Sequence, residues 1–133
     1  MITPVSFELS KLLKEKGFES KSHIAEYWNV EGEQLLVETW EDEYDSFHHE
    51  DCPDDITFVC LAPTISEVVC WIYSKYQIWV QVSILKDDEW HYSIRRKDNN
   101  WNIEFPTKEK YTSMENAYEK GINVVLNTYK PKS

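Results

Sequence analysis

Glycine and proline are scarce in this sequence, with three and five copies among 133 residues. Because these residues punctuate flexible linkers, their scarcity excludes a long low-complexity segment. Long apolar runs are also missing, since none approaches the roughly 20 residues that span a bilayer, and we expect no membrane partner. Basic side chains are few, with 14 Lys and Arg against 24 Asp and Glu and a net charge of −10. This charge disfavours nucleic acid as a partner, because it repels the phosphate backbone.

Cysteine is limited to Cys52, Cys60 and Cys70, an odd number without a CxxC pair. The N-terminal MITPVSFELSK has neither the basic start nor the apolar stretch of a secretory signal. Together these features predict a cytoplasmic protein with reduced thiols.

Motifs of common enzyme classes are missing as well. The sequence contains no GxSxG, P-loop, GxGxxG or HExxH. We therefore predict no catalytic residues, no cofactor-binding residues and no cofactor. A thiol dyad of Cys52 with His48 or His49 is one alternative, but a loop would position it poorly. A metal- or thiol-dependent enzyme is thus the least supported of the functions considered.

The densest charge lies in WEDEYDSFHHEDCPDD, residues 40–55. Residues 1–60 carry 4 basic and 15 acidic side chains, whereas residues 61–133 carry 10 and 9. We interpret residues 41–55 as a solvated, flexible loop, because so many carboxylates with few apolar residues do not fold alone. A row of carboxylates can also imitate a phosphate backbone and attract a basic protein partner. The interaction candidates in this stretch are Glu41, Asp42, Glu43, Asp45, Glu50, Asp51, Asp54 and Asp55.

The same stretch holds the weak metal candidates His48, His49 and Cys52. Adjacent histidines on an extended chain point apart, and no second pair stands at zinc-finger spacing. The pattern of a calcium loop is also missing. We therefore predict no metal site.

Helical periodicity predicts three helices. The first spans about 4–16, with Thr3 as its N-cap and a left-handed Gly17 at its end, after which Phe18 folds back onto Leu13. The second spans about 65–76 and follows a Thr64–Glu67 capping box. The third spans about 113–128 after a Thr112–Glu115 capping box, and its Gly121 permits a close approach to a sheet.

Strand-like runs cover 23–30 and 34–40 as a hairpin, then 56–61, 78–85, 90–96 and 101–105. In the last three, apolar side chains alternate with polar ones, which is typical of half-buried antiparallel strands. To keep Ile84 and Tyr92 on one face, residues 87–89 must form a three-residue loop with a bulge. A four-residue loop at 97–100 would then set Ile94 opposite Ile103. The opposite, outer face would present Trp79, Gln81, Ser83, His91, Ser93, Arg95, Lys97, Asn102 and Glu104.

The predicted order is α-ββ-(β)-α-βββ-α. Each strand of the last three has one apolar face, so the helices must lie on one side of an antiparallel sheet. We therefore predict an α+β two-layer sandwich in a single domain over residues 1–133, with an acidic flexible loop at 41–55.

Four segments carry a resemblance to a known family: SFELSKLLKEKGFES, APTISEVVCWIYSKYQIWVQV, WHYSIRRK and TSMENAYEKGINVVL. Together they cover about half of the chain and resemble small proteins encoded in phages and mobile elements of Bacteroidetes, a family without an assigned activity. Other members carry more charge where this chain has Trp71-Ile72-Tyr73-Ser74. The resemblance implies a phage-related context and contributes no site residue.

The first functional hypothesis is a non-enzymatic interaction protein that binds a protein partner. The alternative is an RNA- or nucleic-acid-binding module in which Trp79 stacks on a base beside Arg95. The α-β-β-β-α order of residues 65–128 is that of double-stranded RNA-binding domains. Those domains need a basic start to the last helix, and here that turn carries Glu115. The sequence makes no prediction of the oligomeric state.

Overall fold

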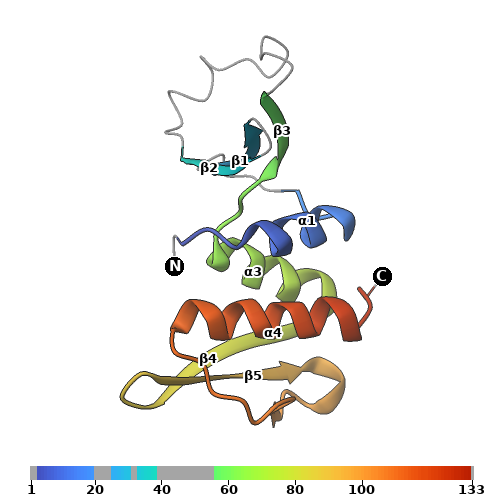
Figure 1. Ribbon diagram of the computed structural model, residues 1–133. Coiled ribbons are helices and arrows are strands. Elements are labelled where there is room, and N and C mark those ends of the chain that lie inside the picture. Colours follow the sequence, from blue (N-terminus) through green and yellow to red (C-terminus); the bar gives the residue numbers. More distant parts are fainter. Residues whose placement is uncertain (1–2, 20–24, 31–32, 39–55, 133) are drawn as a thin grey trace. The chain divides into compact units, whose positions relative to one another are not determined.

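The computed structural model describes residues 3–19, 25–30, 33–38 and 56–132 (Figure 1). The elements follow the predicted order, which confirms the α+β class. By its contacts the chain divides into two compact units, Pro4–Thr64 and Met1–Thr3 with Ile65–Ser133. Within the described residues the strands form two three-stranded sheets, one in each unit, whereas one antiparallel sheet was predicted. One domain over residues 1–133 stays a prediction, and the acidic loop at 41–55 lies outside the described residues.

Helix α1 (Phe7–Glu15) begins later than predicted. Its N-cap is Ser6, whose hydroxyl accepts a hydrogen bond from the Leu9 amide at 3.3 Å, so the prediction of Thr3 is wrong. The reason lies in the residues before it: Val5 donates to the Pro63 carbonyl at 2.9 Å, and Pro4 forms a β-bridge with Thr64. Because bridged residues are extended, the helix starts only after them.

The end of α1 agrees with the prediction. Gly17 has a φ of 90°, in the left-handed region that glycine adopts without steric cost. The amide of Phe18 donates to the Leu13 carbonyl at 2.9 Å, and that of Gly17 donates to Lys14 at 3.2 Å. These two bonds define a Schellman ending.

The sheet of this unit contains β1 (Ala25–Val30), β2 (Glu33–Glu38) and β3 (Ile56–Leu61) in the order β2-β1-β3. Both pairings are antiparallel, which confirms the hairpin and the short strand at 56–61. The Tyr27 ring lies 5.4 Å from that of Phe7, and its hydroxyl donates to the Val5 carbonyl at 2.7 Å. Tyr27 and the buried Ala62 thus join the start of α1 to the sheet.

The other unit contains α3 (Ile65–Tyr76), β4 (Ile78–Lys86), β5 (Glu89–Arg96), β6 (Ile103–Glu104) and α4 (Met114–Thr128). The sheet has the order β4-β5-β6, and both helices lie on one side of it (Figure 1). This confirms the two-layer arrangement for this unit. Its core is formed by Val68, Ile72, Tyr76, Ile78, Val80, Tyr92, Ile94, Ala117, Ile122, Val125 and Leu126.

Helix α4 approaches the sheet closely at Gly121, as predicted. A Cβ atom there would lie 3.0 Å from Tyr92 Cδ2 and 3.0 Å from Val80 Cγ1. The N-cap of α4 is Ser113, whose hydroxyl accepts from the Asn116 amide at 3.1 Å, one residue later than predicted.

The β4–β5 register follows the predicted parity. Val80 pairs with Ile94 and Val82 with Tyr92, so even-numbered side chains point toward the helices. The predicted three-residue loop is wrong, because Glu89 pairs with Lys86 and only residues 87–88 form the turn. A bulge between Ile84 and Lys86 supplies the extra residue that keeps the parity.

The β5–β6 register differs from the prediction by one residue. Ile94 pairs with Glu104, and Ile103 pairs with Arg95. The link between these strands contains a 3-10 turn at Lys97–Asn99 followed by two residues with positive φ, Asn100 at 53° and Trp101 at 59°. This link contains more residues than the four expected. Ile103 therefore pairs with Arg95 and lies on the outer face of the sheet.

Candidate interaction surface

The side of the β4-β5-β6 sheet that faces away from α3 and α4 is the candidate site. Arg95 lies at its middle, because it pairs with Trp79 of β4 on one side and with Ile103 of β6 on the other. Directly paired residues of antiparallel strands share one face of the sheet. The surface, called the aromatic face here, comprises Trp79, Arg95, Trp101, Ile103 and Phe105, together with Tyr73 of α3, whose ring contacts those of Trp79 and Trp101.

Large apolar side chains on the aromatic face are unusually exposed. The exposed fractions are 50% for Tyr73, 38% for Trp79, 44% for Ile103 and 54% for Phe105. Scattered exposed apolar residues are normal in soluble proteins, whereas a cluster of them marks an interaction site.

Three rings of this face form a chain of contacts. The Tyr73 ring from α3 lies 5.8 Å from that of Trp79 in an edge-to-face arrangement. It also lies 5.8 Å from the Trp101 ring, with the planes 29° apart. Offset stacking and edge-to-face contacts are the favourable geometries for aromatic pairs, so these rings hold one another in place.

The two adjacent arginines of β5 have different partners. Arg96 forms ion pairs with Glu104 at 2.7 Å and with Asp98 at 2.9 Å, and the Glu104 hydrogen bond raises its pKa. Arg95 donates from Nη1 to the main-chain carbonyl of Trp101 at 2.9 Å. Within the described part of the chain, no carboxylate forms an ion pair with Arg95.

The rest of the outer face is less open. Ser93 is only 1% exposed and lies between His91 and Arg95 on its own strand and opposite Gln81. The His91 ring lies 5.4 Å from that of Phe105, which continues the aromatic contacts past β6. The open part of the surface is therefore the ring cluster around Arg95 and the Ile103–Phe105 segment.

Of the predicted outer-face residues, Trp79, Gln81, Ser83, His91, Ser93 and Arg95 lie on this face, and the interaction candidates Trp79 and Arg95 are brought together. The placement of Glu104 there is wrong, because Glu104 pairs with the inward-facing Ile94 and not in the predicted register. Lys97 and Asn102 lie in the link between β5 and β6, so their placement stays a prediction. Ile103 and Phe105 were missed because the predicted β5–β6 register was wrong. Tyr73 was also missed, although it does not belong to the helical pattern of buried residues in α3, which signals an exposed ring.

The other predicted candidates lie outside the described residues: Glu41, Asp42, Glu43, Asp45, His48, His49, Glu50, Asp51, Cys52, Asp54 and Asp55. Across 3–19, 25–30, 33–38 and 56–132, no group of three or more His, Cys, Asp or Glu side chains is arranged to hold a metal ion. Cys70 is a free thiol on the exposed side of α3.

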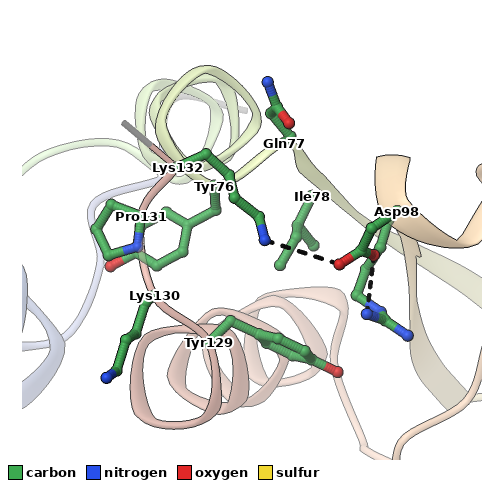
Figure 2. Close-up of a pocket in the computed structure, with 9 residues that line it drawn as sticks. Tyr76, Gln77, Ile78, Asp98, Tyr129, Lys130, Pro131 and Lys132 are labelled. Carbon is green, nitrogen blue, oxygen red and sulfur yellow. Dashed lines mark hydrogen bonds and ion pairs between the residues drawn. The ribbon is translucent and has the colours of Figure 1, made fainter.

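A small pocket of about 120 Å³ lies where the C-terminal tail meets the start of β4 (Figure 2). Lys132 Nζ lies 3.7 Å from Asp98, and Asp98 in turn pairs with Arg96. Arg96 also lies over the Tyr129 ring at 5.4 Å. The volume of the pocket is well below the roughly 300–1,000 Å³ of ordinary small-molecule sites. The Lys132–Asp98 ion pair connects the C-terminal tail to the turn that follows β5.

No protein-family model, curated protein or solved structure matches this chain. The resemblance to phage-encoded proteins therefore stays a prediction. None of the helices in the described part of the chain is long and apolar enough to cross a bilayer.

Proposed function

We propose that this protein is a non-enzymatic interaction module that binds a protein partner through the aromatic face. The observation that carries the proposal is the joint exposure of Tyr73, Trp79, Ile103 and Phe105 around Arg95. Residues that dominate the binding energy of protein interfaces are enriched in Trp, Tyr and Arg, and they cluster near the centre of the patch.

Preorganisation supports the same proposal. The contacts of Tyr73 with Trp79 and Trp101 orient these rings before a partner arrives. Ordering side chains on binding costs about 0.5–1.5 kcal/mol for each one immobilised, and rings already in contact avoid part of that cost. Arg95 lacks an ion-pair partner among the described residues, so a partner carboxylate beside it is the complementary group.

The test compares partner retention by variants of the aromatic face with a matched control. Trp79→Ser combined with Phe105→Ser removes two exposed rings and should reduce retention at least tenfold. Leu36→Ser, at a site that is 42% exposed in the other unit, should leave retention unchanged. Equal retention by all three proteins would rule out the aromatic face as the contact surface.

A nucleic-acid-binding module is the second candidate, because exposed rings beside an arginine can also stack on bases. The near balance of 10 basic and 9 acidic side chains in residues 61–133 argues against it, since phosphate contacts need an excess of cations. A gel-shift with single- and double-stranded RNA at about 50 mM salt decides between the two, because phosphate contacts are strongest at low salt. A shift that Trp79→Ser abolishes would favour this second candidate.

The acidic stretch offers a separate contact for a basic partner. Its eight carboxylates can be converted to amides together, and the retained proteins compared with those of the unaltered chain. Partners lost only on neutralisation would support the acidic contact, and identical sets would sink it. A phage-related, cytoplasmic setting belongs to the same proposal, and the four resembling segments and the free thiol of Cys70 support it.

A further inference from the structure

The outer edge of β4 is long, and the features that normally protect a sheet edge, a lysine and a bulge, are confined to its end at Ile84–Lys86. β4 has nine residues and pairs with β5 alone in the sheet order β4-β5-β6. Between Ile78 and Leu85 it contains no charged residue and no proline. Natural edge strands usually carry a lysine, a proline or an inward-pointing charge, because unpaired main-chain groups recruit further strands.

Two apolar side chains near the end of β4 are exposed, which also indicates that this edge is open. Ile84 is 56% exposed and Leu85 is 49% exposed, although Ile78 and Val80 of the same strand are in the core. Along the other edge of this sheet β6 has only two residues, so a long pairing is available at β4 alone within residues 65–132.

The sequence of β4 is close to a palindrome of residue classes about Val82. Gln81 and Ser83 are both polar, and Val80 and Ile84 are both β-branched and apolar. One step further out, Trp79 and Leu85 are both large and apolar. An antiparallel pair of identical strands centred on Val82 would therefore set like against like at every one of these positions, and it would place no charge opposite another.

We propose that a second copy of this chain pairs with β4 through an antiparallel β4–β4 contact centred on Val82. Two-fold symmetry requires self-complementary surfaces, and the palindromic pattern supplies one. In this register Ile84 of each copy lies opposite Val80 of the other, so the exposed isoleucine is covered. The two sheets become one six-stranded sheet with α3 and α4 of both copies on the same side, and both aromatic faces lie on the opposite side.

The first experiment measures the mass of the full chain by sedimentation over concentrations up to about 1 mM, since a strand-edge contact falls in the weak interface class. We expect a dimer of twice the 15.9 kDa chain mass. Ile84→Lys places a charge opposite Val80 of the other copy and should give a monomer at the same concentrations. Leu36→Lys, an equivalent change in the edge strand β2, should remain a dimer. A monomeric unaltered chain, or a dimer that survives Ile84→Lys, would overturn the proposal.

The second experiment tests the register in a chain whose three cysteines are replaced by serine. Directly opposed residues have Cα atoms about 4.5–5.5 Å apart, which a disulfide can span. Val82→Cys should therefore form a disulfide-linked dimer on mild oxidation. Ile84→Cys is more exposed, but it would lie about 13 Å along the strand from its own copy and should stay unlinked. Efficient linking at position 84, or none at position 82, would contradict this register. Phe105→Ser alone alters the aromatic face and leaves β4 unchanged, whereas Ile84→Lys alters β4 and leaves the aromatic face unchanged, so failure of either proposal is visible independently.

Discussion

The rings of Tyr73 and Trp101 stack at 5.8 Å, although one belongs to α3 and the other to the link between β5 and β6. Trp101 reaches this position with a φ of 59°, a conformation that a bulky residue rarely adopts. Backbone strain of this kind persists only where the surroundings enforce it, and here the Arg95 hydrogen bond to the Trp101 carbonyl does so. The aromatic face is thus built by the link as much as by the strands.

Gly121→Ala tests the contact between α4 and the sheet. Alanine improves helix propensity by about 1 kcal/mol, but its Cβ would lie 3.0 Å from both Tyr92 and Val80. Overpacking a core typically costs about 1–3 kcal/mol, so we expect the free energy of unfolding to fall by about 1 kcal/mol. Urea denaturation measures it, with the exposed Lys120→Ala as control. A variant more stable than the unaltered chain would show that the sheet yields at this point.

Gly17→Ala tests the Schellman ending of α1. Nothing lies within 4 Å of the added Cβ, so the cost is that of the backbone alone, whose φ is 90°. We expect a loss of about 1 kcal/mol in unfolding free energy, because the left-handed region costs other residues about that much. Amide exchange of Phe18, which donates to Leu13, should accelerate in the variant. Unchanged exchange and stability would mean that the ending does not contribute.

Much of the structure of the unit that contains α3, α4 and the β4-β5-β6 sheet could be predicted from local sequence patterns. Strict alternation over 78–85 predicts which side chains of β4 face the core, because a strand has only two sides. The parity survives the wrong turn length, since the bulge near Leu85 replaces the extra loop residue. The C-terminal end of α1 and both ends of α3 agree with the prediction, because capping residues and Gly17 act through local geometry.

The errors share a physical cause, which is that distant segments decided the local structure. The start of α1 depends on Pro4 and Val5 pairing with residues 63–64, some sixty positions away. The β5–β6 register depends on two positive-φ residues, Asn100 and Trp101, and tryptophan carries no local preference for that conformation. The aromatic face therefore needed the structure, although its Trp79 and Arg95 were predicted from alternation.

The Arg96–Glu104 pair predicts an acid-dependent stability. The Arg96 hydrogen bond lowers the pKa of Glu104, so the folded chain holds that proton less tightly than the unfolded chain. The resulting stabilisation is present above the unfolded pKa of about 4.3 and is lost as pH falls through the folded pKa. Glu104→Gln should cost about 1 kcal/mol at pH 7 and progressively less below about pH 4. Urea denaturation at pH 7 and below about pH 4 measures the free energy of unfolding, with Asp87→Asn as control. A cost independent of pH would contradict the ion pair.

The Tyr111 hydroxyl should lose its proton at a higher pH than an ordinary tyrosine. Burial, followed by its 2.9 Å hydrogen bond to Glu109, raises its pKa to about 12. Because the folded pKa lies above the unfolded one, this stabilisation is present below about pH 10 and is lost as pH rises through about 12. Carbon-13 NMR of the labelled tyrosine ring, assigned with Tyr111→Phe, follows the titration. Glu109→Gln should lower the pKa, and a titration near pH 10 in the unaltered chain would show that the hydroxyl is open to water.

Photo-crosslinking tests the role of the aromatic face most directly. A photoreactive phenylalanine analogue is placed at Tyr73, at Phe105, or at the exposed Lys120 of α4 in cells that make the protein. We expect the same discrete protein adduct from positions 73 and 105 and none from position 120. Excess unlabelled chain should compete the adduct away, and excess Trp79→Ser, Phe105→Ser chain should not. Adducts that form equally from all three positions, or that both competitors remove equally, would contradict a partner bound at this face.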